Sequence, residues 1–289
     1  MRARVATVVR RVAPWSPAVY RRALKLMDRA LERIGVVDSE DEIIVAANAV
    51  WNAPAEALSK GNIHFRGAGP FSNDALWLEI GREHLELYKS FARAVGFDRP
   101  LRSVVDWGCG GGLNAFQFGP LADEYVGVDV AVATLDECER QAKTAGTPKF
   151  RPILIEIAQP EAAIDQISTQ CDLFLCTYVF EVFPTRDYGL RILRIAEQLL
   201  APGGMAFVQI KYATGSRRTA SYRRGYRRNL SQMAAYFIDE FWLSAQDCGL
   251  MPKLVTLVPQ HVLDPRYAYF LLMKPTDAEH TRAVSKNGP

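Results

Sequence analysis

From residue 101 onward, short apolar runs alternate with amphipathic stretches of helical period. Strands are expected where apolar runs are short and continuous, and helices where apolar residues recur every three or four positions. The expected strand and helix pairs are 104–106 with 113–118, 125–129 with 133–145, 150–157 with 161–169, and 173–178 with 188–200, followed by a strand at 206–212. Strands that alternate with helices predict a parallel sheet with right-handed crossovers.

The end of the chain departs from this alternation. A helix is expected over 233–248, and two strands follow at 253–259 and 267–273. A short proline-containing loop joins these strands, so they suit an antiparallel pair at the sheet edge. The pattern therefore predicts a doubly wound α/β fold, with a mostly parallel sheet of seven strands and an antiparallel last strand.

The part before residue 101 divides into a basic extension and a cap. Residues 18–34 have helical period, with Tyr20, Leu24, Met27, Leu31 and Ile34 on one face and arginines on the other. We expect this helix to pack on the domain through its apolar stripe; contact with an anionic membrane surface and a transit peptide are the alternatives. A second helix is expected over 77–95 as an N-terminal helical cap. The predicted parts are 1–60 (basic extension), 61–275 (main domain, with its core at 101–275) and 276–289 (disordered tail).

Composition sets bounds on the class of protein. The 289 residues carry a net charge of +3, and 23% of them are charged, as in ordinary soluble proteins. No apolar run is long enough to cross a membrane. The five cysteines show no C-x-x-C pair and no metal-like spacing with histidine. We therefore expect reduced thiols, a cytoplasmic location and no bound metal.

The turn after the first expected strand carries the strongest chemical signal. It reads Val104-Val105-Asp106-Trp107-Gly108-Cys109-Gly110-Gly111-Gly112-Leu113-Asn114. Glycines accept positive φ and have no Cβ, so a ligand can lie against the backbone, and the N–H groups of the next helix point toward it. Asp129 ends the second strand. Both loops lie at the carboxyl edge of such a sheet, which predicts a pocket for a ribose-containing cofactor.

Two kinds of cofactor match this loop. Gly110-x-Gly112-x-x-Ala115 satisfies the dinucleotide pattern, and Asp129 follows at a suitable spacing. However, Asp106 and Trp107 separate the strand from the first glycine, Gly108. A carboxylate at this mouth would repel a pyrophosphate, whereas it suits a cationic ligand.

On these residues the chain resembles the class I S-adenosylmethionine-dependent methyltransferases. Their acid-x-Gly-x-Gly-x-Gly motif is present at 106–112, and Asp129 matches the acid that holds both ribose hydroxyls in the family. Residues 172–181 look like the family's fourth strand and its active-site end, and residues 200–204 match the turn before the fifth strand. The resemblance covers roughly 101–275. It implies a Rossmann-like domain that uses S-adenosylmethionine as cofactor.

The resemblance also implies a set of donor-binding residues. Glycines let the backbone approach the methionine portion, Asp106 orients that portion, and Glu156 or Ile157 contacts adenine. The full predicted set is Asp106, Gly108, Cys109, Gly110, Gly112, Asn114, Asp129, Val130, Glu156, Ile157, Thr177 and Tyr178.

Methyl transfer needs alignment of the reacting atoms and exclusion of water, and a hydroxyl acceptor also needs a base. Many relatives place a histidine after the glutamate that follows strand four, but here that position is Val182. The candidate catalytic residues are therefore His261, His64 and Glu181. His84 lies on a helix face, where a packing role is expected. We expect O-methylation of a small molecule, a sugar or a lipid-linked glycan. A tRNA or rRNA methyltransferase and a non-catalytic donor-binding subunit are the alternatives.

Basic residues are concentrated in two segments, which bears on the acceptor. Residues 2–33 carry nine arginines and lysines but only two acids, Asp28 and Glu32. Residues 215–229 contain three arginine pairs interleaved with Tyr222 and Tyr226. Because this segment follows the fifth strand, it predicts a lid that binds an anionic or sugar-like acceptor, or else a solvated basic loop. Arginine with tyrosine can also hold nucleic acid, but the modest net charge and the lack of an RNA-binding module argue against it.

Overall fold

The computed structural model describes residues 17–54, 65–258, 263–276 and 278. Within these residues, seven strands form one sheet in the order β3-β2-β1-β4-β5-β7-β6. The strands are β1 (Leu101–Trp107), β2 (Ala122–Asp129), β3 (Phe150–Leu154), β4 (Cys171–Cys176), β5 (Leu200–Lys211), β6 (Met251–Val258) and β7 (Tyr267–Met273). The first five pair in parallel, and β7 runs antiparallel to both β5 and β6. The predicted α/β fold is confirmed.

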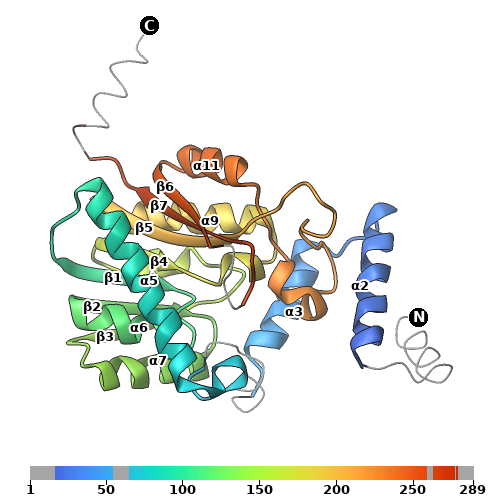
Figure 1. The fold of residues 1–289 in the computed structure, drawn as a ribbon, viewed down its shortest axis with the longest axis horizontal. Helices are drawn as coiled ribbons and strands as arrows, with labels where there is room; N and C mark the ends of the chain where they lie inside the picture. The colour runs from blue at the N-terminus through green and yellow to red at the C-terminus, as the bar shows by residue number, and fades with distance from the viewer. Residues whose placement is uncertain (1–16, 55–64, 259–262, 277, 279–289) are drawn as a thin grey trace, which may run out of the picture.

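Helices cover both faces of the sheet (Figure 1). One face carries α5 (Asp74–Val95), α6 (Leu113–Phe118) and α7 (Val132–Ala145), and the other carries α8 (Ala162–Gln166), α9 (Arg186–Leu199) and α11 (Ile238–Asp247). Successive strand residues point to opposite faces. Val104 and Leu173 pack toward the first group of helices, and Val105 and Phe174 pack toward the second. All four of these side chains are fully buried.

Some expected element boundaries were wrong. The expected helix over 233–248 begins only at Ile238, because Tyr236 exchanges backbone hydrogen bonds with Lys211 and Ala213 beside the end of β5. β3 ends at Leu154, where its pairing with Asp129 at the end of β2 stops, and a turn follows at 157–158. β5 begins at Leu200, which pairs with Cys171 ahead of the glycine turn.

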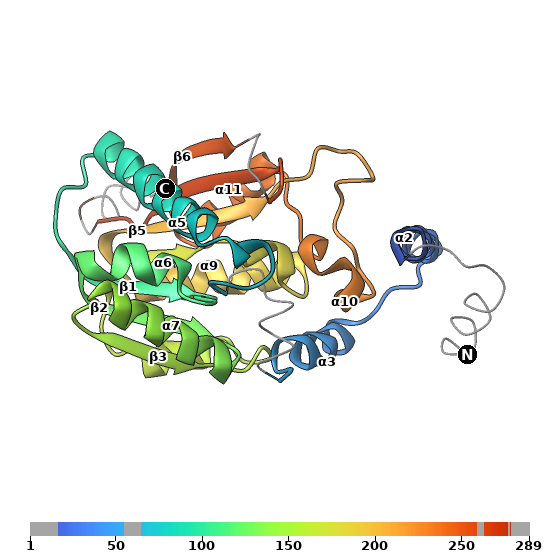
Figure 2. The ribbon, with the colours of Figure 1, turned by 60° about the horizontal axis from the view of Figure 1, so that its bottom comes forward.

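The N-terminal extension contains two described helices, α2 (Pro17–Arg33) and α3 (Glu40–Trp51). Ser39 caps α3, and its backbone N–H donates to Glu42 at 2.9 Å in a capping box. Figure 2 shows α3 beside the sheet and α2 farther out, beyond the short helix α10 (Tyr226–Asn229). The predicted apolar stripe packs only in part: Tyr20, Leu24 and Leu31 are half-buried, whereas Met27 is 41% exposed and Ile34, one residue past the end of α2, 74%.

Two predictions on composition can be compared with the described residues. All five cysteines are buried and free, as expected for reduced thiols. No helix in the described ranges has both the length and the apolar character needed to cross a membrane. The expected tail at 276–289 and the first sixteen residues lie outside the described residues, apart from positions 276 and 278.

Candidate functional site

A cavity of about 490 Å³ opens at the carboxyl ends of β1, β2 and β4. The glycine loop after β1 forms one side. The other side is formed by α3, the short helix η3 (Phe180–Val182), the segment 226–231 and the β6–β7 connection. Ligands of open α/β sheets bind at this edge, so the topology alone marks the cavity as the candidate site.

The glycine loop is pressed against the loop after β4. Gly108 has φ +67°, and a Cβ there would lie 2.5 Å from Cγ2 of Val179. Only glycine fits this position, because both the backbone conformation and the space exclude a side chain. Gly112 has φ +83°, but its missing Cβ makes room for Cys138 of α7. The packing of α7 therefore explains why residue 112 is glycine. The prediction that the bare backbone approaches the ligand fits Gly108 better.

Asp129 lies half-buried in the cavity wall at the end of β2. Its carboxylate accepts hydrogen bonds from the N–H groups of Gly110 (3.1 Å), Val130 (2.7 Å) and Ala131 (3.2 Å). These bonds fix the side chain, while burial raises the pKa of Asp129 to about 6. An ionised carboxylate held in this way can accept hydrogen bonds from a pair of ribose hydroxyls.

Asp106 is buried behind the loop and does not line the cavity. It accepts hydrogen bonds from the hydroxyl of Tyr125 (2.7 Å) and the amide of Asn114 (3.4 Å), and burial raises its pKa to about 7. Asn114 does line the cavity. Asp106 therefore reaches the candidate site through Asn114, rather than by facing it as the motif suggested.

His84 of α5 connects the cap to this loop. Its Nδ1 lies 2.9 Å from Oδ1 of Asn114, and its Nε2 lies 3.1 Å from the hydroxyls of both Tyr178 and Tyr269. Tyr178 follows β4 and has φ +61°, a conformation rarely adopted by residues other than glycine. His84 is buried, as a packing role predicted, but its hydrogen bonds to two cavity-lining residues were not foreseen.

Most predicted donor-binding residues meet at the cavity, together with one candidate catalytic residue, Glu181. The lining members are Gly108, Cys109, Gly110, Asn114, Asp129, Val130, Ile157, Thr177 and Tyr178. Asp106, Gly112 and Glu156 do not line it, and Glu156 is exposed to solvent. His64 and His261 lie outside the described residues. Within the described ranges, no three His, Cys, Asp or Glu side chains converge as a metal site would require.

Charged side chains gather at the far end of the cavity. Glu181 is 3% exposed; its Oε1 accepts a hydrogen bond from the Tyr267 hydroxyl at 3.3 Å, and its Oε2 has no hydrogen-bond partner. Burial raises the pKa of Glu181 above its usual range, although the nearby ammonium of Lys211 opposes the shift. Lys211 forms a 2.5 Å ion pair with Asp264 and donates to the carbonyl of Ser231 at 2.8 Å.

Sequence reasoning missed Lys211, Asp264 and Tyr267. A lysine at the end of the fifth strand was the one available signal, because the ends of neighbouring parallel strands meet at the same edge. Asp264 and Tyr267 come from the antiparallel pair, whose register with β5 is set by packing. Nothing in the local pattern places them beside Glu181.

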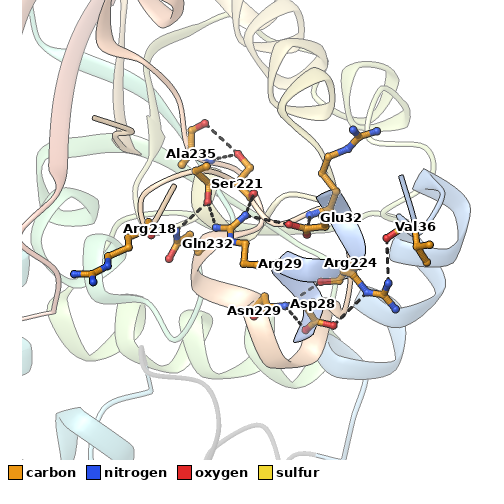
Figure 3. Close-up of polar contacts among 12 residues, drawn as sticks. Asp28, Arg29, Glu32, Val36, Arg218, Ser221, Arg224, Asn229, Gln232 and Ala235 are labelled. Atoms are coloured by element: carbon orange, nitrogen blue, oxygen red, sulfur yellow. Dashed lines mark hydrogen bonds and ion pairs between the residues drawn. The ribbon is translucent and has the colours of Figure 1, made fainter. Parts of the chain in front are cut away.

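The basic segment 216–232, here called the strap, forms part of the cavity wall but does not present its arginines to it. Among the described lining residues there is no arginine, and the strap contributes Tyr226, Leu230 and Ser231. Arg224 instead binds Asp28 of α2 at 3.2 Å (Figure 3), and Arg228 binds the same carboxylate at 2.8 Å. The expected lid is therefore a wall of the cavity, and one arginine of each of its second and third pairs, Arg224 and Arg228, holds it to α2.

Comparisons with known proteins agree with this geometry. Residues 105–206 match a family model described as a methyltransferase domain. A ubiquinone biosynthesis O-methyltransferase from Paracidovorax citrulli is 28% identical over 108 residues, which cover 37% of this chain and 42% of the relative. The match thus spans about two-fifths of that relative's length.

Solved structures share the fold at low identity. An N-methyltransferase from Bradyrhizobium japonicum superposes with a TM-score of 0.51 at 13% identity, over 70% of this chain and 98% of the other. Magnesium protoporphyrin IX methyltransferase from Synechocystis, which holds S-adenosylhomocysteine, gives 0.51 at 12% identity over 68% and 85%.

The fold is that of the class I methyltransferases. Residues 105–206 match a methyltransferase domain, as the glycine loop predicted, and S-adenosylmethionine is the cofactor that the resemblance implies. The cavity fits S-adenosylmethionine for two reasons. Gly108 leaves the backbone without a side chain at the cavity wall, and the Asp129 carboxylate is held in place where it can accept hydrogen bonds from hydroxyl groups. The dinucleotide alternative is set aside.

Proposed function

We propose that the protein methylates a hydroxyl oxygen of a small acceptor, with Glu181 as the general base. The observation that carries this proposal is Oε2 of Glu181, which is buried without a hydrogen-bond donor at the wall of the cavity that holds the donor loop. A buried carboxylate oxygen without a donor is costly, so it marks a place where a ligand is expected to supply one.

A hydroxyl supplies that donor, and the raised pKa of Glu181 suits the role of base. Glu181 follows Thr177 and Tyr178 in the same loop, so base and donor-binding residues are positioned together. When bound, the cofactor supplies an electrophilic methyl group on a sulfonium. Oε2 of Glu181 would accept the proton that the acceptor hydroxyl loses when it takes up this methyl group. The aromatic walls exclude water from this step.

The described walls at this end favour a neutral acceptor with apolar surface. Trp51, Phe183, Tyr226 and Leu230 line it, and the ammonium of Lys211 is already paired with Asp264. An anionic acceptor would meet Glu181 without a spare cation among the described lining residues. A phenol, or the hydroxylated head of a lipid, meets these requirements. The name of the curated relative, an O-methyltransferase of ubiquinone biosynthesis, accords with this class.

The test is a screen of phenolic, lipid and glycan pools with isotopically labelled S-adenosylmethionine, read by mass spectrometry. The wild-type chain is expected to label a hydroxylated apolar acceptor. Glu181→Gln should lower kcat at least a hundredfold, while S-adenosylhomocysteine affinity stays within twofold. The exposed carboxylate Glu156 provides the control, since Glu156→Gln should turn over normally. Labelling of an amine or of RNA instead, or full activity in Glu181→Gln, would contradict the proposal.

A further inference from the structure

The two faces of α2 differ sharply in what they contact. The inner face is fastened to the strap: Asp28 is fully buried against Arg228 and Asn229, and Arg29 donates to the carbonyl of Ser221 at 2.6 Å. The guanidinium of Arg29 also lies 3.5 Å from the centroid of the Tyr222 ring. Figure 3 shows Arg29 beside Ser221 of the strap. These contacts hold α2 to the wall of the cavity through polar groups.

The outer face carries an apolar stripe. Leu26 is 64% exposed, Met27 41% and Ile34 74%, and Ala30 between them is also exposed. Positions 26 and 30 are four residues apart, so they lie along one side of the helix, and Ile34 follows in the turn that ends it. Figures 1 and 2 both show α2 at the margin of the molecule, beyond α10 and away from the sheet.

The charges of α2 are divided between the two faces. Both of its acids face the strap, where Asp28 binds the arginines and Glu32 accepts a hydrogen bond from the backbone N–H of Arg223 at 2.6 Å. The exposed charges are all basic: Arg21, Arg22 and Arg33. At a helical period of 3.6 residues, Arg22 and Arg33 both lie along one edge of the apolar stripe, next to Leu26. An apolar stripe bordered by cations complements a surface with apolar interior and anionic headgroups.

We propose that α2 docks this protein onto an anionic lipid bilayer, with Leu26, Ala30 and Ile34 buried at the interface and Arg22 and Arg33 against the headgroups. Because α2 is bound to the strap that lines the cavity, docking of α2 would hold the cavity close to the membrane surface. The docking surface lies outside the methyltransferase site, so it can be tested without any turnover. Arginine alone would also suit RNA, but an RNA site has no need of the apolar stripe.

The experiment is co-sedimentation of the full chain with phosphatidylcholine vesicles, with and without phosphatidylglycerol. Binding is expected only with phosphatidylglycerol and should weaken with salt. Arg22→Gln with Arg33→Gln should lower the partition coefficient about twenty-five-fold, since each basic residue near the surface contributes about fivefold. Leu26→Gln with Ile34→Gln should lower it at least tenfold.

Matched control variants distinguish binding through α2 from a general effect of replacing exposed side chains. Lys143→Gln on α7 and Leu243→Gln on α11 replace side chains of similar exposure, 70% and 60%, and should bind like the wild type. Three results would overturn the proposal: no sedimentation with anionic vesicles, equal loss in the controls, or a dimer in solution that the Leu26→Gln variant dissociates. RNA binding that depends on the arginines and ignores Leu26 and Ile34, without vesicle binding, would also overturn it.

Discussion

The contact between α2 and the strap can be tested through Asp28. This carboxylate is fully buried; Arg224 beside it is 4% exposed, and Asn229 donates to it at 3.0 Å. Asp28→Ala would leave the Arg224 guanidinium buried without its counter-ion. Breaking a buried pair on one side costs about 3–5 kcal/mol. Arg228 is 39% exposed and can recover hydration, so a cost of about 3 kcal/mol is expected.

That cost should appear as local opening rather than global unfolding, because α2 stands outside the sheet and its two cores (Figure 2). Amide hydrogen exchange reports such opening directly. The amides to follow are Tyr222, which bonds to Gln232, and Gly225, which bonds to Asp38. At about 1.4 kcal/mol for each factor of ten, their exchange should accelerate on the order of a hundredfold.

The donor half of the site should not respond, because Gly108, Asp129 and Thr177 are positioned by β1, β2 and β4. Affinity for S-adenosylhomocysteine, measured by calorimetry, is expected to stay within twofold in Asp28→Ala. Asp123→Ala removes an exposed aspartate of β2 and should change neither measurement. Unchanged exchange in the strap, or a tenfold loss of donor affinity, would refute the division of the cavity into two independently built halves.

Three further results are expected at the donor loop and the base. Gly108→Ala should abolish S-adenosylhomocysteine binding, because its Cβ clashes with Val179. Adding Val179→Ala should restore binding in part, with about 1–2 kcal/mol of backbone strain remaining. Equal affinities of the single and double variants would show that the clash is absent. Asp129→Ala should weaken S-adenosylhomocysteine binding by about 1–3 kcal/mol. The wild-type affinity should fall as pH drops through about 6, where the Asp129 carboxylate becomes protonated. An affinity that stays constant from about pH 5 to 8 would contradict this. kcat should rise with pH through the raised pKa of Glu181, because only the ionised carboxylate accepts a proton; a rising limb that persists in Glu181→Gln would assign it to another group.

The donor half could be predicted from sequence because it depends on short, contiguous segments. A glycine run after a strand and an acid at the end of the next strand dictate their own local geometry, and nine of the twelve predicted donor-binding residues line the cavity. Glu156 is not among the lining residues, because Ile155 and Ile157, which follow the end of β3 at Leu154, point to the cavity and Glu156 between them points to solvent. Two of the three candidate catalytic residues, His64 and His261, lie outside the described residues, while Glu181 lies at the cavity wall.

The acceptor half could not be predicted, because it is assembled from residues far apart in sequence. Trp51 of α3 donates to the hydroxyl of Tyr226 at 2.8 Å, and Lys211 pairs with Asp264 of the β6–β7 connection. Periodicity predicts that each of these elements exists, but not which side chains meet. The strap illustrates the difficulty: its arginine pairs suggested ligand binding, yet their partner is a carboxylate almost 200 residues earlier.

The distribution of charge gives the basic extension a physical meaning that its composition does not show. Residues 2–33 contain only two acids, and both lie on the side of α2 that faces the strap. Pairing there neutralises part of a cationic segment and leaves an outward surface of one sign beside exposed apolar residues. If α2 only needed to be soluble, its acids would be expected on the outer face and its apolar residues on the inner one. In α2 both acids face the strap, while Leu26 and Met27 are exposed and Leu24 and Leu31 are half-buried. This division favours an apolar, anionic surface as the partner of α2.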